Sequence, residues 1–240
     1  MPGVLVDDMD IVVPVRAVPR AEQLRYALRS WAANLPHRRV WVVGHRPPWL
    51  TDAGHIPTVQ DGSKYRNTTA AVRAACLHPE VSQTFLLCND DFFVMHPLPG
   101  GMPVLHRGPV RTVEAAYAAR PGEYLEGMRQ TRELLTDLGH PEPLSYELHV
   151  PLPVDRDGML DALDLGGHLP VLHKRTLYGN LAGLGGEEIA DVKILHRAPR
   201  GYGAGDRFLS TMPDSFTNGA VGRHIREAFP QRCRYERGGR

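Results

Sequence analysis

The sequence predicts an α/β fold in which a mostly parallel sheet is flanked by helices. Two kinds of observation favour this fold: continuous apolar runs at residues 10–15, 40–44 and 84–88, and helical patterns between them at residues 21–35 and 68–77. Continuous apolar runs of this length are typical of strands buried on both faces. A strand, a helix and a second strand in succession imply a right-handed crossover and parallel strands.

The first half of the chain alternates strands and helices in the order of a nucleotide-binding half-sheet. Pro14 cannot donate a hydrogen bond to a neighbouring strand, so it should lie near the end of its strand. Asn67 is predicted to cap the second helix. Strands are expected at residues 10–15, 40–44, 56–60 and 84–88, and helices at residues 21–35 and 68–77.

Beyond residue 98 the chain changes character, beginning with a loop rich in Pro and Gly. We therefore expect residues 1–98 to form a nucleotide-binding half and residues 99–240 to form the other half of the same domain. Further strands are expected at residues 104–106, 145–150 and 191–195, helices at residues 113–119, 124–138, 157–163, 176–181 and 221–229, and loops at residues 208–212 and 215–218.

The composition is that of an ordinary globular protein, with 240 residues, of which 42% are hydrophobic and 23% charged. A formal net charge of +1 excludes a strong bias of the whole molecule toward nucleic acid or anionic membranes. Three widely spaced cysteines without a CxxC motif favour neither a disulfide framework nor a zinc site. No signal peptide or apolar run of transmembrane length is present, so we expect a cytoplasmic protein without a membrane partner. The absence of G-x-G-x-x-G and Walker A motifs argues against a Rossmann dehydrogenase and a P-loop NTPase.

Asn89, Asp90 and Asp91 directly follow the apolar run at residues 84–88, so they should lie where that strand leaves the sheet. Ligands of open α/β sheets bind at this carboxyl edge, and paired carboxylates suit Mg²⁺ or Mn²⁺. The alternative is a solvated turn, because Asn and Asp are ordinary turn residues. Two aromatic residues follow at once, which favours the metal site.

Four further residues are candidates for contacts with a nucleotide at this edge. Asp10, at the start of the first strand, is a candidate for contact with the nucleotide or the metal; the alternative is a solvated strand start. Arg16 follows the first strand, and Lys64 and Arg66 follow the strand predicted at residues 56–60. These three positive charges are candidates for holding phosphates, with solvated loops as the alternative.

His149 and Arg175 are the candidates for chemistry in the second half. Imidazole titrates near neutrality, so His149 is a candidate general acid or base, with a structural hydrogen-bonding role as the alternative. Arg175 is able to pair bidentately with a phosphate, or else is a surface cation. The basic C-terminus either contacts a polyanion or forms a solvated end. Its arginines are Arg223, Arg226, Arg232, Arg234, Arg237 and Arg240.

The first half resembles the Stealth-type sugar-phosphate transferases and a related group of phage-encoded glycosyltransferases. A weaker resemblance to the phage group extends over residues 145–230. The segments that carry the resemblance are residues 10–15, 23–31, 40–44 with 48–50, and 85–93, and then residues 146–151, Arg175 and residues 178–180.

This resemblance implies a GT-A-like fold with an acceptor-side lobe in the C-terminal half, and a nucleotide-sugar substrate such as a UDP-sugar. It also implies Mn²⁺ or Mg²⁺ bound by the Asn-Asp-Asp motif, with Asp90 or Asp91 as metal ligand or base. His149 and Arg175 would then lie at the phosphates or the reaction centre. The chain is short and shows Val15-Arg16-Ala17-Val18 where Stealth proteins have a stretch with Trp and Gly, which favours plain sugar transfer.

The leading hypothesis is therefore a metal-dependent glycosyltransferase acting on an acceptor hydroxyl. The alternatives are a Stealth-like sugar-phosphate transferase, a metal-dependent phosphodiesterase or nuclease, and a non-enzymatic binding module of a phage particle. For a phage-type enzyme two acceptors stay open, a hydroxymethylated base in DNA or a virion protein, and the host cytoplasm would be its location.

Overall fold

The computed structural model describes residues 9–198 and 201–237. Its strands are β1 (Asp10–Val15), β2 (Val40–Gly44), β3 (Gly54–Ile56), β4 (Thr84–Leu87), β5 (Phe92–Val94), β6 (Leu105–His106), β7 (Leu152–Asp155), β8 (Glu187–Glu188), β9 (Lys193–Ile194) and β10 (Phe208–Thr211). Its helices are α1 (Glu22–Asn34), α2 (Lys64–Leu77), α3 (Val110–Tyr117), α4 (Glu123–Asp137), α5 (Arg156–Leu165), α6 (Lys174–Leu181), α7 (Pro213–Asn218) and α8 (Ala220–Ala228).

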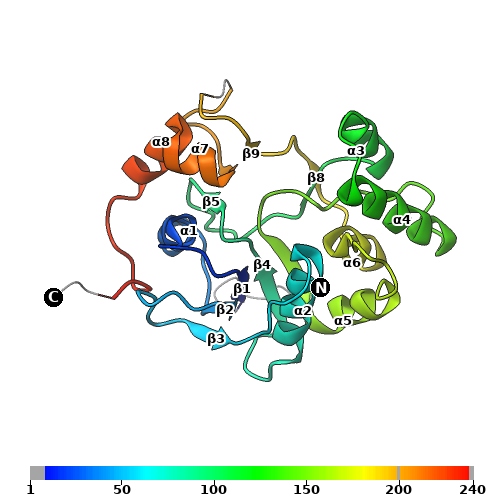
Figure 1. The fold of residues 1–240 in the computed structure, drawn as a ribbon, viewed down its shortest axis with the longest axis horizontal. Helices are drawn as coiled ribbons and strands as arrows, with labels where there is room; N and C mark the ends of the chain where they lie inside the picture. Colours follow the sequence, from blue (N-terminus) through cyan, green and yellow to red (C-terminus); the bar gives the residue numbers. More distant parts are fainter. Residues whose placement is uncertain (1–8, 199–200, 238–240) are drawn as a thin grey trace.

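A five-stranded sheet in the order β3-β2-β1-β4-β7 forms the centre of the fold. The first four strands are parallel, and β7 joins the edge of β4 in the antiparallel direction. Figure 1 shows α1, α7 and α8 on one side of this sheet and α2 and α5 on the other. The predicted fold class, a mostly parallel sheet flanked by helices, is confirmed.

Alternate residues of β1 face the two helical layers, as the strand geometry requires. Ile11 and Val13 pack in the hydrophobic cluster that contains α1 and α8, whereas Val12 packs in the cluster formed with α2, α5 and α6. All three side chains are fully buried. The continuous apolar sequence of β1 thus reflects a strand covered on both faces.

A second, three-stranded sheet in the order β5-β10-β9 follows the carboxyl end of β4. Phe92 lies opposite Ser210, and Ser210 lies opposite Lys193. This small sheet connects the segment after the Asn-Asp-Asp motif with a part of the chain about a hundred residues away.

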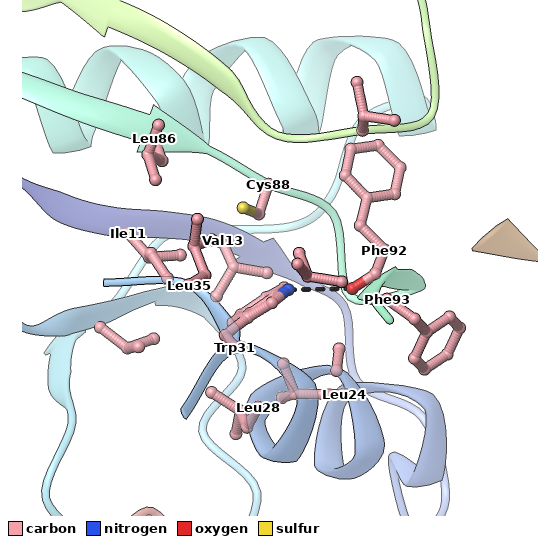
Figure 2. Close-up of a cluster of buried hydrophobic side chains, with 14 of the residues drawn as sticks. Ile11, Val13, Leu24, Leu28, Trp31, Leu35, Leu86, Cys88, Phe92 and Phe93 are labelled. Carbon is pink, nitrogen blue, oxygen red and sulfur yellow. Dashed lines mark hydrogen bonds between the residues drawn. The ribbon is translucent and has the colours of Figure 1, made fainter. Parts of the chain in front are cut away.

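Helix α1 holds the segment that follows the Asn-Asp-Asp motif in place, as Figure 2 shows. The buried indole of Trp31 donates a hydrogen bond from Nε1 to the carbonyl of Phe92 at 2.9 Å. One turn further on, Asn34 Nδ2 donates to the carbonyl of Val94 at 2.7 Å, and the Val94 amide donates to Ser30 Oγ at 3.1 Å. The two aromatic residues after the motif therefore belong to a buried strand.

Several predicted boundaries are wrong in the first half. Helix α2 begins at Lys64, one turn before the predicted start, because Ser63 caps it by accepting the amide of Arg66 at 3.3 Å. Lys64 and Arg66 thus lie on the first turn of a helix and not in a loop. The short strand expected at residues 56–60 lies earlier, at Gly54–Ile56.

The second half contains larger errors. The strand predicted at residues 145–150 is an irregular segment, and the strand that joins the sheet is the next one, Leu152–Asp155. The loop predicted at residues 208–212 contains β10, whose four residues are all buried, and the loop at residues 215–218 belongs to α7. Strand β10 was missed because it pairs with β5. That strand has only three residues and was itself not predicted, so no partner for residues 208–211 was expected.

The C-terminal segment packs on α1 as far as it is described. Glu236 accepts hydrogen bonds from Arg29 at 2.6 and 2.9 Å, and its backbone bridges to Leu50. Arg234 Nη2 donates to the hydroxyl of Tyr235 at 2.7 Å. Tyr235 and Glu236 are buried, whereas Arg232, Arg234 and Arg237 are exposed, and Arg240 lies outside the described residues. None of the helices described here combines the length and apolar character needed to cross a bilayer.

Candidate active site

The Asn-Asp-Asp turn (residues 89–91) lies at the carboxyl end of β4, as predicted. The amide of Cys88 still donates to the carbonyl of Val12 on β1 at 2.9 Å, so the sheet continues up to the residue before the turn. The amide of Phe92 then donates to the carbonyl of Asn89 at 3.3 Å and closes the turn. The carboxylates of Asp90 and Asp91 are thus delivered to the sheet edge at which ligands of α/β folds bind.

A pocket of about 310 Å³ opens beside this turn. Its lining includes Arg16, Lys64, Asn89 and Asp90, together with Gln60 and the first turns of α2. Gln60 Nε2 donates to the carbonyl of Val15 at 2.7 Å. That contact needs the glycine at the end of β2, because a Cβ on Gly44 would lie 2.2 Å from the Gln60 nitrogen. Two cations and a carboxylate therefore meet in one pocket.

Asp90 has an unusual proton affinity. Burial is the main cause, followed by the neighbouring charge of Asp91, and together they raise the pKa of Asp90 to about 6. Arg16 and Lys193 oppose the shift by stabilising the carboxylate. Desolvation and the adjacent carboxylate thus disfavour the charge of Asp90 more than these two cations favour it, and a further cation bound there would offset the difference.

Replacing Asp90 by Asn is expected to stabilise the fold by about 1–3 kcal/mol near pH 7.5, because asparagine never carries the unfavourable buried charge. A carboxyl with a raised pKa in the folded state stabilises the protein only at low pH. That contribution is lost as the pH rises from the unfolded value near 4 to the folded value of about 6. The gain from Asp90→Asn should therefore shrink as the pH is lowered toward about 4.5.

Urea unfolding in the presence of EDTA measures this effect without stabilisation by bound metal. Asp161→Asn is the matched control, because Asp161 is exposed on α5. We expect no pH-dependent gain for this control. An Asp90→Asn protein that is no more stable than the wild type near neutral pH would contradict the raised pKa of Asp90.

Asp91 has two partners from the small second sheet. Lys193 Nζ forms an ion pair with Asp91 Oδ2, and Ser210 Oγ donates to the same oxygen at 3.0 Å. The side chains of Asp91 and Lys193 are only 11% and 14% exposed. A positive charge is therefore already accommodated at this carboxylate.

The residues of the turn fit a divalent cation bound through few protein ligands. Asn89, Asp90 and Asp91 supply the oxygen atoms that Mg²⁺ and Mn²⁺ prefer, and the ammonium at Asp91 marks a position suited to a cation. Within residues 9–198 and 201–237, no three His, Cys, Asp or Glu side chains gather as a metal-binding group. Mg²⁺ commonly completes its coordination with water and substrate phosphates, so two carboxylates suffice.

His149 is oriented by an acidic residue that the sequence did not reveal. Its Nδ1 lies 2.8 and 3.0 Å from the two carboxylate oxygens of Asp191. Arg107 Nη1 lies 3.5 Å from Asp191 Oδ2. Burial alone would raise the pKa of Asp191, but the hydrogen bond from His149 and the charges of His149 and Arg107 hold it below its usual value. Because a carboxylate only accepts, Nδ1 carries a proton in this contact, and Nε2 is the ring nitrogen left to face a substrate.

Helix α6 brings Lys174 and Arg175 to the same region. The partly buried carboxylate of Glu147 accepts hydrogen bonds from the amides of Arg175 and Thr176 at 3.1 and 3.4 Å and thereby caps the helix. Arg175 Nη2 donates to the carbonyl of Val150, and its guanidinium lies 5.5 Å from the ring centre of Phe92. Its Nε is buried without a hydrogen-bond partner.

Lys174 and Arg175 form a cationic cradle in a pocket of about 170 Å³, which Asn89, Glu147 and His149 also line. Burial lowers the pKa of Lys174 and of Arg175, although the charge of Glu147 opposes the shift. Two buried cations with one capping carboxylate leave net positive charge beside His149. Such a cradle is suited to an anionic group such as a phosphate.

A larger pocket of about 820 Å³ adjoins both smaller ones, sharing Lys64 with the first and His149 with the second. Three tyrosines line it, and Tyr117 and Tyr124 have ring centres 5.4 Å apart. Its remaining lining includes Arg107, Arg120, Asp191, Lys193, Leu195 and Met212. His149 thus lies between a cationic cradle and a wide, partly aromatic pocket.

The structure brings together most of the residues predicted from the sequence. Arg16, Lys64, Asn89 and Asp90 line the first pocket, and Asn89, His149 and Arg175 line the second, which shares Asn89 with the first. Asp91 lies in the same turn.

Two predicted residues lie elsewhere, and their assignment to the nucleotide or metal is corrected. Asp10 is at the amino end of β1, the opposite edge of the sheet, where it accepts two hydrogen bonds from Arg38 at 2.9 and 2.7 Å and one from Trp41 at 2.8 Å. Its carboxylate has a structural role there. Arg66 lines a separate pocket with Glu123 and Glu126, because it projects from another side of α2.

Four site residues were missed: Glu147, Lys174, Asp191 and Lys193. Lys174 had a signal, since it stands between His173 and Arg175 in a basic triplet. No sequence pattern pointed to Asp191 or Lys193, because only the folded chain brings them next to His149 and Asp91.

No family model matches the chain. An exopolysaccharide phosphotransferase of Nocardia farcinica (strain IFM 10152) is 29% identical over 158 residues, which is 58% of this chain and 31% of that protein. The chain is similar to this phosphotransferase over that stretch. The resemblance to sugar-phosphate transferases drawn from the sequence is thereby confirmed, and it spans about a third of the relative's length.

Among solved structures, the apo form of the glycosyltransferase GlyE of Streptococcus pneumoniae TIGR4 is 10% identical, with a TM-score of 0.38, covering 76% of this chain and 45% of GlyE. Mouse xyloside xylosyltransferase 1 in its apo form is 9% identical, with a TM-score of 0.39, covering 95% of this chain and 96% of the mouse chain. At these TM-scores the two likenesses carry no argument about this protein.

Proposed function

We propose that the protein transfers a sugar phosphate from a nucleotide-activated sugar to an acceptor hydroxyl. The observation that carries this proposal is the cationic cradle of Lys174 and Arg175, which shares a pocket with His149. Phosphate-binding cations next to a candidate base favour attack at phosphorus. The name of the Nocardia relative, an exopolysaccharide phosphotransferase, agrees with this chemistry.

In this proposal the diphosphate of the nucleotide-sugar, such as a UDP-sugar, lies along the carboxyl edge of the sheet. Arg16 and Lys64 bind one end and Lys174 and Arg175 the other, with the Asn-Asp-Asp turn between them. Asp90 and Asp91 would hold Mn²⁺ or Mg²⁺, which would neutralise negative charge on the diphosphate. The acceptor enters through the pocket of about 820 Å³, which reaches His149.

His149 acts as the general base in the proposed reaction. Its Nε2 takes the proton of the acceptor hydroxyl as the oxygen forms a bond to the sugar-bearing phosphorus. The bond from that phosphorus to the bridging oxygen breaks, and the nucleoside monophosphate leaves with the electron pair. Lys174 and Arg175 stabilise the negative charge that spreads over the phosphoryl oxygens. Asp191 holds the imidazole in the tautomer that this step requires.

Plain sugar transfer is the second candidate. It is favoured by the pocket of about 310 Å³, where Arg16 and Lys64, together with a cation on Asp90, would hold a leaving nucleoside diphosphate. The acceptor hydroxyl would then attack the anomeric carbon. A hydroxymethylated DNA base and a protein hydroxyl stay open as acceptors. The described C-terminal arginines do not line the acceptor pocket, so they give no support for DNA.

A thermal-shift screen of nucleotide-sugars with Mn²⁺, followed by mass spectrometry of the products, tests both candidates. Bound nucleotide-sugar raises the apparent melting temperature. Sugar-phosphate transfer leaves a nucleoside monophosphate and a product heavier by one phosphoryl unit than plain sugar transfer. Absence of any shift across the panel, together with no product, would refute the transferase proposal and support a binding module. Cleavage of nucleic acid without a nucleotide-sugar would support the phosphodiesterase.

A further inference from the structure

The lysine at Asp91 comes from a strand about a hundred residues away. Strand β9 runs parallel to β10 with Lys193 opposite Ser210, and β10 runs antiparallel to β5 with Ser210 opposite Phe92. Asp91 immediately precedes Phe92, so the register of the small sheet places Lys193 and Ser210 beside its carboxylate. The ion pair thus follows from the pairing of three strands and is built into the fold.

The environment makes this ion pair stronger than a surface pair. Lys193 and Asp91 retain only 14% and 11% of their side-chain exposure, so water screens their attraction weakly. Ser210 Oγ adds a hydrogen bond of 3.0 Å to the same oxygen of Asp91. No other lysine of the described chain forms an ion pair with a residue of the Asn-Asp-Asp turn.

We propose that Lys193 is an internal cation that occupies the metal position at Asp91 and is displaced when a divalent cation binds. This inference rests on the metal site within the proposed function. The ammonium contacts Oδ2 of Asp91, so a metal ion on this carboxylate would lie a few ångströms from it, and two positive charges at that distance repel each other. Metal binding therefore requires Lys193 to leave, and the free protein is held in a metal-poor form.

Once displaced from Asp91, the ammonium of Lys193 would enter a neighbouring pocket. Lys193 also lines the pocket of about 820 Å³, together with His149 and Asp191. Departure from Asp91 would turn the ammonium into this pocket and add a positive charge where the acceptor enters. Binding of a divalent cation at the Asn-Asp-Asp turn would thereby increase the positive charge of the pocket through which the acceptor enters.

Titration with Mn²⁺ alone, followed by electron paramagnetic resonance of the free ion, tests the competition. If Lys193 occupies Asp91 about nine-tenths of the time, it weakens the apparent affinity for Mn²⁺ about tenfold. Lys193→Met should then bind Mn²⁺ about tenfold more tightly than the wild type. Lys193→Arg, which keeps the charge, should bind no more tightly than the wild type. Arg39→Met is the matched control, because Arg39 pairs with Glu80 at the opposite edge of the sheet and its loss should leave the affinity unchanged.

Asp91→Asn should weaken Mn²⁺ binding in the wild type and should cancel the gain in Lys193→Met. Equal Mn²⁺ affinity of Lys193→Met and the wild type would overturn the proposal, as would absence of Mn²⁺ binding in both. Lys193→Gln replaces Lys193→Met if the melting curve shows that the latter is unfolded. Because no sugar substrate is present, a protein that shows the predicted affinities but transfers nothing would overturn the proposed function alone.

Discussion

Asp90→Asn is expected to reduce transfer by roughly a thousandfold or more while leaving a folded and more stable protein. In the proposed reaction the carboxylate binds the cation that neutralises the diphosphate, and the amide lacks the negative charge that this cation needs. The raised pKa of about 6 shows that the fold maintains this charge at a cost in stability. Residues whose removal stabilises the fold and destroys activity are typical of functional sites.

Initial rates of product formation at saturating Mn²⁺ measure this loss, and the unfolding free energy is determined on the same sample. Asp161→Asn, on the exposed side of α5, should retain wild-type activity. Asp91→Ala should also abolish turnover, and its effect should exceed that of Ser210→Ala, since the serine only supports the carboxylate. Near-normal turnover of Asp90→Asn would remove Asp90 from the proposed site.

The sequence was sufficient to predict the three middle strands β1, β2 and β4 of the central sheet and the place of the Asn-Asp-Asp turn. Strands β1, β2 and β4 are buried on both faces, so their residues form continuous apolar runs that stand out from the surrounding chain. The position of a polar turn after such a strand then follows from parallel topology alone. The same reasoning failed for Asp10, because a carboxylate at the start of a strand belongs to the opposite edge.

The second sheet and the partners of the site could not be predicted. Strands β5 and β9 have three and two residues, too few for any periodicity, and β9 is only partly buried. Lys193 reaches Asp91, and Asp191 reaches His149, only because these short strands pair across the fold. Asp191 lies 42 residues from its histidine. Long-range pairing of this kind leaves no local pattern in a single sequence.

His149→Gln is expected to lower kcat by about a hundredfold to ten-thousandfold, the range found when a general base is removed. KM for the nucleotide-sugar should change little, because in the proposed complex Lys174 and Arg175 still hold its phosphates. Asp191→Asn should lower kcat less, since it leaves the imidazole in place but no longer fixes its tautomer. The exposed residue His168 provides the control His168→Gln, which should behave as the wild type.

The pH dependence of kcat separates a positioning role of Asp191 from a merely structural one. With the carboxylate present, a negative charge stabilises the imidazolium that forms when His149 takes the acceptor proton. Without it the imidazolium is less stable, so the acidic limb of the pH–rate profile should move to lower pH in Asp191→Asn, and the rate at its plateau should fall. Loss of folding alone would lower the rate at every pH and leave the midpoint of that limb unchanged. An unshifted midpoint with a normal melting curve would show that Asp191 does not act through His149.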